Sequence, residues 1–251
     1  MKKSRLPQRV VDRVVSVAAE LRDRVDALHF GATVPWIYNP LNYAWQTHEQ
    51  YLRRYAKATC RVLLLGMNPG PWGMAQTGVP FGEVNAVVNF LGIDAPVGKP
   101  PKEHPKRLIE GLGCTRSEVS GQRLWGLFQE RYKQPEKFFE EHFVANYCPL
   151  VFMEESAKNL TPDKLPSGVR KPLEAVCDAH LSQLILALEP QWVIGVGSFA
   201  EECAKRVLSE RHGGSAVKTG RILHPSPASP AANRDWSGTA TKQLIELGIW
   251  Q

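Results

Sequence analysis

The sequence has 251 residues, of which 43% are hydrophobic and 22% charged, and its formal net charge is +6 at pH 7. These values are ordinary for a globular protein with a substantial core, and no stretch approaches the roughly 20 apolar residues of a membrane span. The positive charge is compatible with an anionic ligand, nucleic acid included, but does not identify one.

The N-terminal segment is expected to form an amphipathic helix over about residues 7–28. Asp12 and Arg13 interrupt the apolar residues of this segment, so we do not expect a secretory signal. The apolar stripe indicates packing against a core. Its members recur at helical spacing and are Val10, Val14, Val17, Leu21, Val25 and Leu28.

Four apolar segments are expected to be buried strands, because each is nearly continuous in apolar residues over strand length. Helical patterns separate them, and this alternation predicts a parallel sheet in a single three-layer α/β domain that spans 1–251. The expected strands cover residues 60–67, 143–152, 191–198 and a segment from 217 that ends at His224 and Pro225. We expect the second of them to be interrupted at Asn146 and to stop at Pro149. The expected helices after the first cover 48–58, 83–93, 123–132, 135–142, 171–189, a segment that begins at Ser198, and 234–247. Pro172 stands near the first turn of the helix over 171–189.

Polar residues and turns follow the ends of these strands. Asn68, Asn146, the pair Gly197–Ser198 and His224 all stand at carboxyl ends. Ligands of parallel α/β sheets bind beyond these ends, so we expect the four positions to converge on one crevice.

Several kinds of site are excluded by what the motifs lack. The loop GMNPGPWG, which begins at Gly66, has no Lys followed by Ser or Thr, as a Walker-type phosphate site requires. GVGSFAE lacks the third glycine of a dinucleotide fingerprint, and no GxSxG elbow is present. Carboxylates and clustered histidines are missing from the strand ends, which argues against metal-dependent hydrolysis.

The cysteines also give no support for a metal. They are widely separated, no pair has CxxC spacing, and we expect buried free thiols in a reducing compartment. We therefore expect neither a metal nor a cofactor. The five cysteines are Cys60, Cys114, Cys148, Cys177 and Cys203.

The remaining site contains no acid: two amides, the His224 imidazole, the Phe81 ring and several backbone N–H groups. An amide accepts no proton near neutral pH, so it can only orient a water or read a hydrogen-bonding edge. Such a site suits a leaving group that departs as an anion stabilised by hydrogen bonds. Uracil fits, because an Asn can match its Watson–Crick edge, a Phe can stack on its face and an imidazole N–H can meet the charge on O2. The sugar would pass through an oxocarbenium-like state.

Two long motifs carry a resemblance to a known family. GMNPGPWGMAQTGVPFG, from Gly66, and HPSPASPAANRDW, from His224, resemble the single-strand-selective monofunctional uracil-DNA glycosylases of the uracil-DNA glycosylase superfamily. The resemblance extends from about residue 30 to the C-terminus and includes FVANYCPL, NLTPDKLP and GVGS in the same order. It implies a three-layer αβα sandwich around a four-stranded, mainly parallel sheet, with no metal or cofactor. The implied activity excises uracil and 5-hydroxymethyluracil from DNA and leaves an abasic site.

The resemblance also assigns roles in the base pocket. Asn68 resembles the residue that positions the hydrolytic water, and Phe81 resembles the aromatic residue that stacks on the flipped base. Asn146 resembles the reader of the base edge, and His224 resembles the group that stabilises the uracil anion. The backbone around Met67 and Gly70 is expected to line the pocket.

DNA contacts are expected from two segments. Ser198, at a helix N-terminus, and Ser226 can bind phosphates. The segment between Pro225 and Arg234 resembles a wedge that fills the vacated stack. Ala228 stands where relatives can carry a basic residue, so Asn233 and Arg234 are expected to share that work.

Two alternatives remain open from the sequence: a catalytically inactive nucleic-acid binder on the same fold, and a glycosylase for hypoxanthine or xanthine. The expected partner is uracil-containing DNA, single- or double-stranded, and the chain is expected to act as a monomer. The expected compartment is the cytoplasm with its nucleoid in a bacterium or the nucleus in a eukaryote. Phosphate contacts are also expected from Lys99 and Lys102 in the basic loop 98–106.

Overall fold

The computed structural model describes residues 7–210 and 216–251. Its central sheet has four strands in the order β3-β2-β6-β7, and all neighbouring strands run parallel. The strands are β2 (Val62–Gly66), β3 (His142–Asn146), β6 (Trp192–Val196) and β7 (Lys218–Ile222). The predicted α/β fold with a four-stranded parallel sheet is confirmed.

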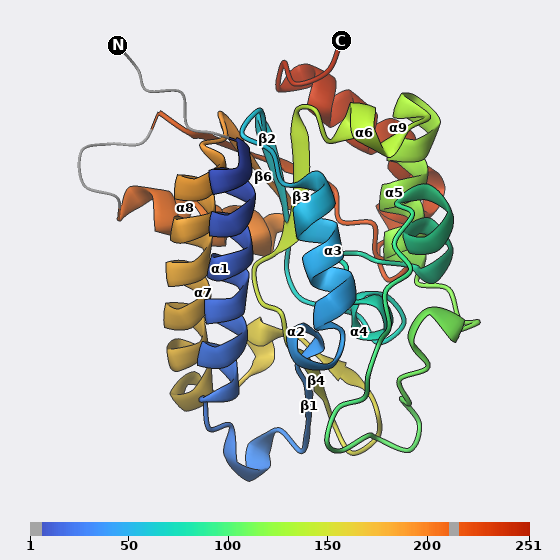
Figure 1. Ribbon diagram of the computed structural model, residues 1–251, viewed down its shortest axis with the longest axis vertical. Helices are drawn as coiled ribbons and strands as arrows, with labels where there is room; N and C mark the ends of the chain where they lie inside the picture. Colours follow the sequence, from blue (N-terminus) through green and yellow to red (C-terminus); the bar gives the residue numbers. More distant parts are fainter. Residues whose placement is uncertain (1–6, 211–215) are drawn as a thin grey trace.

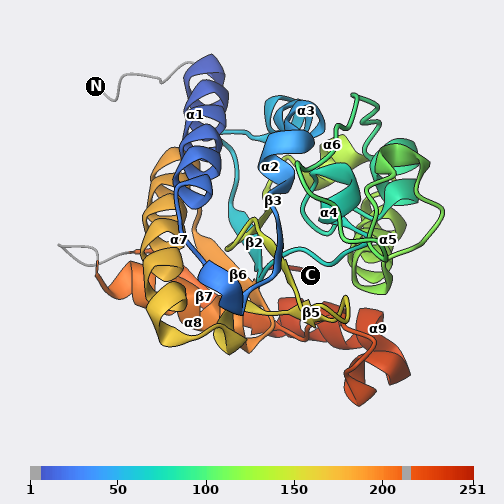
Figure 2. The same ribbon diagram turned by 90° about the horizontal axis from the view of Figure 1, so that it is seen from below.

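Helices cover both faces of this sheet. α1, α7 and α8 gather on one side, and α5, α6 and α9 lie on the other (Figures 1 and 2). α1 packs along α7, although the two are far apart in sequence. The longer helices are α1 (Pro7–Asp26), α3 (Trp45–Tyr55), α5 (Val119–Tyr132), α7 (Ser167–Leu188), α8 (Ser198–Ser209) and α9 (Pro230–Glu246). The short ones are α2 (Pro40–Tyr43), α4 (Met74–Thr77) and α6 (Pro135–Phe138).

Most of the predicted helices exist, but some of their ends differ. The helix predicted over 135–142 ends at Phe138, and His142 is already the first residue of β3. The N-terminal helix ends at Asp26, two residues before the predicted end. The C-terminal helix begins at Pro230 instead of 234, because the Ser229 side chain accepts a hydrogen bond from the Ala232 N–H at 3.3 Å and proline suits the first helical position. α7 begins at Ser167, which places Pro172 beyond its first turn.

The segment 143–152 forms two strands. The interruption predicted at Asn146 and the stop predicted at Pro149 are confirmed, and the residues after Pro149 belong to another sheet. β3 ends at Asn146, and β4 (Val151–Met153) joins a separate antiparallel sheet in the order β1-β4-β5. Pro149 explains the break, since it has no N–H with which to continue the ladder. The other members of the small sheet are β1 (Trp36–Tyr38) and β5 (Asn159–Leu160).

The helix predicted over 83–93 is wrong in extent. The helical segment runs only from 84 to 90: Val84 and Asn85 lead into one wide π-type turn over Ala86–Phe90, and the Leu91 N–H closes this turn on the Ala86 carbonyl at 2.9 Å. The apolar residues of this segment nevertheless reach the core, as their spacing predicted. Val87 and Leu91 are fully buried.

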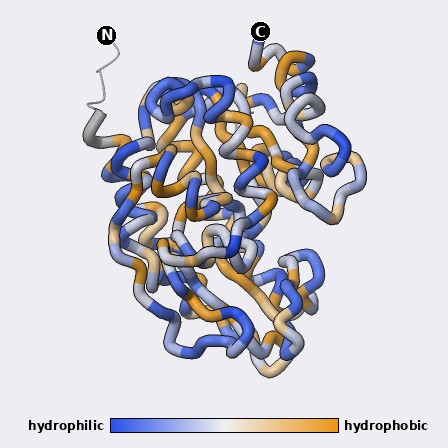
Figure 3. The backbone as a smooth tube through the Cα atoms, turned by 90° about the vertical axis from the view of Figure 1, so that its right-hand side faces the viewer, coloured by the Kyte–Doolittle hydropathy of each residue, from blue (hydrophilic) through white to orange (hydrophobic). Residues whose placement is uncertain are grey.

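The core lies between the sheet and its helices, and the hydrophobic stretches of the chain run through the interior in Figure 3. Val62 to Leu65 are completely buried, as expected for a strand covered on both faces. The five cysteines are buried free thiols, which confirms that prediction. Within residues 7–210 and 216–251, no helix is long and apolar enough to span a membrane, and no group of three metal-ligating side chains occurs.

Candidate active site

A cavity of about 540 Å³ opens beyond the carboxyl ends of β2, β3 and β7. The predicted convergence of Asn68, Asn146 and His224 is therefore confirmed. Ser198 lies at the start of α8, exposed and outside the lining. The predicted residues that line the cavity are Met67, Asn68, Gly70, Phe81, Asn146, His224 and Ser226.

Gly66 explains how two of these side chains meet. It pairs with Asn146 across β2 and β3, and a Cβ at Gly66 would overlap the Asn146 amide oxygen and lie 2.5 Å from the Phe81 ring. Both side chains therefore reach the space above Gly66, which only glycine leaves open. A flat ring held there can meet the Asn146 amide with its edge and the Phe81 ring with its face.

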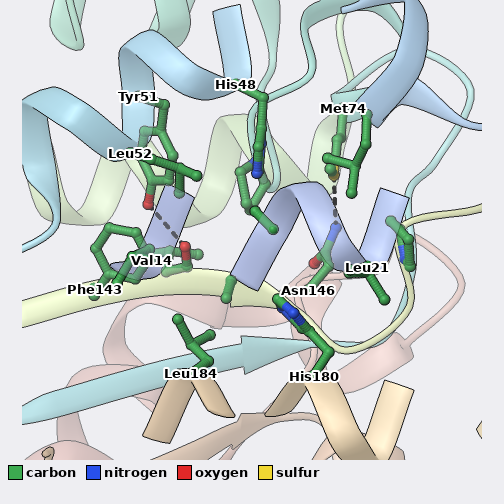
Figure 4. Close-up of a pocket in the computed structure, with 16 residues that line it drawn as sticks. Val14, Leu21, His48, Tyr51, Leu52, Met74, Phe143, Asn146, His180 and Leu184 are labelled. Carbon is green, nitrogen blue, oxygen red and sulfur yellow. Dashed lines mark hydrogen bonds between the residues drawn. The ribbon is translucent and has the colours of Figure 1, made fainter. Parts of the chain in front are cut away.

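Asn146 is fixed from behind. Its amide nitrogen donates a hydrogen bond to the Met74 sulfur at 3.3 Å, which leaves one N–H and the amide oxygen for a ligand (Figure 4). A small second cavity of about 30 Å³ lies on this side, and apolar side chains of α1 and α7 surround it. Burial lowers the pKa of its His48 and His180 to about 4, so both are neutral. Asn146 therefore has an uncharged, apolar setting behind it.

Asn68 is oriented by the connection between β3 and β4. Its amide nitrogen donates to the Leu150 carbonyl at 3.1 Å. The same connection is attached to the end of β2, since the Cys148 N–H donates to the Met67 carbonyl at 2.9 Å. With its nitrogen engaged, the Asn68 oxygen is the atom that can accept a hydrogen bond from a water.

His224 is a neutral imidazole whose outer N–H is available. The Ser226 N–H donates to His224 Nδ1 at 3.1 Å, so the ring proton resides on Nε2. Burial lowers the pKa of His224 below its usual 6.5. Gly197, with φ +94°, leaves room for the ring, since a Cβ there would lie 3.2 Å from His224 Cβ. The imidazole can therefore donate one hydrogen bond into the cavity.

Phe81 holds an unusual backbone conformation, with φ 53°. A bulky residue in this region is strained and requires support from its surroundings. α5 supplies it: Gly121 packs so closely on the Phe81 carbonyl that any side chain at Gly121 would overlap it. The Phe81 ring lies 6.3 Å from the His224 ring, with 45° between their planes.

The prediction that the site contains no acid is wrong. Glu118, immediately before α5, lines the same cavity. A Cβ at either Gly70 or Gly73 would overlap its carboxylate oxygens, so the carboxyl group lies against the loop that holds Asn68. Desolvation, with a smaller contribution from Glu83, raises the pKa of Glu118 to about 7. The sequence analysis looked for site residues at the ends of strands and therefore missed Glu118, which stands at the N-terminus of a helix.

The raised pKa of Glu118 has a consequence for stability. Glu118 binds its proton more tightly in the folded state than in the unfolded state, where its pKa is 4.5. The free energy of unfolding of the protein therefore falls as the pH rises from 4.5 through the folded-state pKa of about 7. Glu118→Gln is therefore expected to raise the free energy of unfolding by about 1–2 kcal/mol at about pH 8, after allowance for solvent screening. The two proteins should be equally stable near pH 4. Thermal unfolding at both pH values measures this, and equal melting temperatures at pH 8 would contradict it.

The predicted wedge residues have mixed outcomes. Ala228 is exposed in the turn between His224 and α9. Arg234 is also exposed, and it lies within the first turns of α9. Asn233 is engaged internally: its nitrogen donates to the Pro227 carbonyl at 2.8 Å, and its oxygen accepts from Arg123 at 2.9 Å. Arg123, which the sequence analysis missed, also donates to the Pro225 carbonyl at 3.1 Å. Asn233 therefore braces the turn that carries Ala228.

Basic side chains that the sequence analysis missed lie at one wall of the cavity. The guanidinium groups of Arg107 and Arg116 lie 5.1 and 4.6 Å from the centre of the Trp72 ring, which lines the cavity. In contrast, Lys99 pairs with Glu103, and Lys102 lies over Trp36 outside the lining. Two arginines are therefore stacked on an aromatic ring that lines the cavity.

Comparison with known proteins identifies the class to which this fold and site belong. The uracil DNA glycosylase superfamily matches residues 53–246. The chain is 46% identical over 243 residues to the single-strand selective monofunctional uracil DNA glycosylase of Bos taurus, which covers 97% of this chain and 89% of the relative. It is 48% identical over 229 residues to the protein of that name from Mus musculus, which covers 91% and 81%. The chain belongs to the uracil DNA glycosylase superfamily.

A solved structure supports the fold. The wild-type SMUG2 protein of Pedobacter heparinus is 17% identical in sequence and superimposes with a TM-score of 0.62, over 92% of this chain and 97% of that one. At this identity the likeness concerns the arrangement of helices and strands alone.

Proposed function

We propose that this protein is a DNA glycosylase that hydrolyses the N-glycosidic bond of uracil in DNA and leaves an abasic site. One observation carries the proposal: Asn68, Phe81, Asn146 and His224 line a single cavity, and the hydrogen bonds around them leave each free for the required contact. The curated relatives are named uracil DNA glycosylases, which supports the same reaction. Among the residues that the structure describes, no lysine lines the cavity; we therefore propose a monofunctional enzyme, which does not use an amine for Schiff-base chemistry.

The proposed mechanism assigns one contact to each side chain. Asn146 accepts from uracil N3–H and donates to O4, while Phe81 stacks on the ring. The bond between C1′ and N1 breaks with its electron pair on uracil, and His224 Nε2–H donates to the charge that develops at O2. Asn68 accepts a hydrogen bond from the water that attacks C1′. The water's proton leaves with solvent or with the base, since an amide cannot hold it.

The nucleotide must first leave the stack, which costs roughly a few kcal/mol. In our proposal, the exposed turn around Ala228 enters the vacated space, and Ser198, Ser226 and Arg234 contact flanking phosphates. The protein acts as a monomer on single- and double-stranded DNA. It works where DNA is kept, in the nucleoid of a bacterium or the nucleus of a eukaryote.

The function is tested by single-turnover cleavage of oligonucleotides that carry uracil, hypoxanthine or xanthine in one sequence context. We expect uracil to be excised most rapidly, because its N3–H and O4 match the Asn146 amide and its single ring needs less space beside Phe81 than the two rings of a purine that offers the same hydrogen-bonding pair. Excision of hypoxanthine or xanthine without uracil would favour a glycosylase for other deaminated bases. Binding of uracil-DNA without cleavage of any substrate would indicate a binding protein.

The C5 position of the base gives a second expectation: 5-hydroxymethyluracil is excised and thymine is not. An apolar pocket alone rejects one methyl group by only roughly 1–3 kcal/mol. A water held at C5 increases this difference, because a methyl displaces it without replacing its hydrogen bonds, whereas a hydroxymethyl group can replace them. A cleavage series of uracil, 5-hydroxymethyluracil and thymine measures it. If 5-hydroxymethyluracil and thymine were excised equally slowly, the proposed water beside C5 would be excluded.

DNA binding is expected to weaken markedly with salt, since the proposed phosphate contacts release counterions. A protein that contacts several phosphates loses orders of magnitude in affinity between about 50 and 200 mM salt. Arg116→Ala should reduce the slope of log affinity against log salt by about one unit if it meets a phosphate. Fluorescence anisotropy with a labelled oligonucleotide measures both. A slope that Arg116→Ala leaves unchanged would exclude this arginine from the phosphate contacts.

A further inference from the structure

Among the described residues 7–210 and 216–251, Glu118 is the one carboxylic acid that lines the cavity, and it has no part in the proposed hydrolysis. Its carboxyl group is held against Gly70 and Gly73, the two glycines that flank Pro71 and Trp72. Any side chain at either glycine would overlap it. The spacing G-P-W-G in the first motif is thus matched to a carboxyl group that arrives from the start of α5.

The carboxyl group lacks a partner. Among residues 7–210 and 216–251, no donor hydrogen-bonds to it and no cation pairs with it. Glu83, its nearest charged neighbour, is itself engaged, since it accepts a hydrogen bond from the Ala86 N–H at 2.9 Å. An unpartnered polar group in a half-buried position is costly unless a ligand or a water satisfies it.

The orientation of the base indicates which ligand group Glu118 meets. This step rests on the proposed function. With O2 at His224 and the N3–O4 edge at Asn146, two sides of the uracil ring are occupied, and N1 carries the sugar. The C5–C6 edge must then face the remaining wall, which the loop from Met67 to Gly73 forms together with Glu118.

We propose that Glu118 is a specificity-determining residue that reads the C5 position of the base. Its carboxyl group hydrogen-bonds the oxygen of a 5-hydroxymethyl group, or the water that stands in that place when the base is uracil. The methyl group of thymine would displace the water and leave the carboxyl group unpaired, which disfavours thymine.

The charge state of Glu118 fits this role. Its pKa of about 7 lets a neutral acid donate a hydrogen bond at physiological pH, and the ionised form would place a negative charge beside the departing uracil anion. The titratable groups that face it are Glu83 from the segment after Phe81 and His224 from the cavity, which is neutral in this range. Excision of uracil should therefore slow above neutral pH.

The test compares the wild type with Glu118→Ala and Glu118→Gln in single-turnover excision of uracil, 5-hydroxymethyluracil and thymine from one sequence context. Glu118→Ala should lower the rate ratio of 5-hydroxymethyluracil to uracil by about tenfold and raise that of thymine to uracil. Glu118→Gln keeps an N–H donor and should preserve both ratios. Glu83→Gln, which neutralises a carboxylate outside the lining, is the matched control and should also preserve them.

Ratios of rates are insensitive to a general loss of folded enzyme, which separates specificity from structural damage. If Glu118→Ala does not fold, the pH profile decides: the rate on uracil should fall between about pH 6 and 8.5 in the wild type and stay level in Glu118→Gln. Unchanged ratios in Glu118→Ala, or the same alkaline decline in Glu118→Gln, would overturn the proposal. Absence of uracil excision by the wild type would instead reject the proposed function itself.

Discussion

Asn68→Ala is expected to reduce the single-turnover rate of uracil excision roughly 10²–10³-fold, by analogy with the loss of one preorganised transition-state contact. The amide nitrogen is held by the Leu150 carbonyl, so the oxygen is left to position the water, and alanine removes that acceptor. Binding of uracil-DNA should survive, because the base contacts of Asn146 and Phe81 remain. Rapid-quench cleavage and fluorescence anisotropy measure the two quantities separately.

Two variants sharpen this test. Asn89→Ala removes an exposed amide from the π-type turn and should leave the rate unchanged. Asn68→Asp keeps an acceptor for the water but replaces the donor to the Leu150 carbonyl, so its rate should fall between those of the wild type and Asn68→Ala. A rate for Asn68→Ala close to that of the wild type would remove Asn68 from the mechanism.

His224→Ala is expected to lower the single-turnover rate by roughly 10²-fold while changing the affinity for uracil-DNA only slightly, because the charge that His224 meets arises mainly in the transition state. The neutral ring donates through Nε2, since Nδ1 accepts from the Ser226 N–H. His224→Gln retains a side-chain N–H and should recover part of the rate. Parallel losses of rate and affinity would make His224 a ground-state or packing residue.

The pH dependence distinguishes this role from that of a charged histidine. Burial lowers the pKa of His224 below 6.5, so the neutral form predominates at neutral pH. A cationic catalyst would lose its charge as pH rises through 6.5, and the rate would fall. The neutral donor predicts that no decline assigned to His224 occurs on raising the pH from about 6 to 7.5. The decline expected between about pH 6 and 8.5 belongs to Glu118, so it should persist in His224→Ala and disappear in Glu118→Gln.

The sheet and three side chains of the cavity could be predicted from local patterns in the chain. Continuous apolar runs marked buried parallel strands, and parallel strands carry their carboxyl ends to one edge. Asn68, Asn146 and His224 could therefore be placed together before any coordinates were known, and the structure confirms their meeting. The resemblance of the first motif assigned Phe81 to the face of the base, and the structure places its ring in the same cavity.

The side chains that reach the cavity from other parts of the chain could not be predicted from the sequence and are visible only in the folded protein. Glu118 and Arg123 lie at the start of α5, 36 and 41 residues after Gly82, where the first long motif ends, and more than 100 residues before His224, where the second begins. They reach the site because α5 packs on the Phe81 backbone through Gly121. The break at Pro149 was visible in the sequence, but the use of the Leu150 carbonyl to hold Asn68 was not. The physical reason is that strand periodicity is a local property, whereas the partner of a side chain depends on packing between segments distant in sequence. The protonation of Glu118 depends on the same packing, since burial raises its pKa.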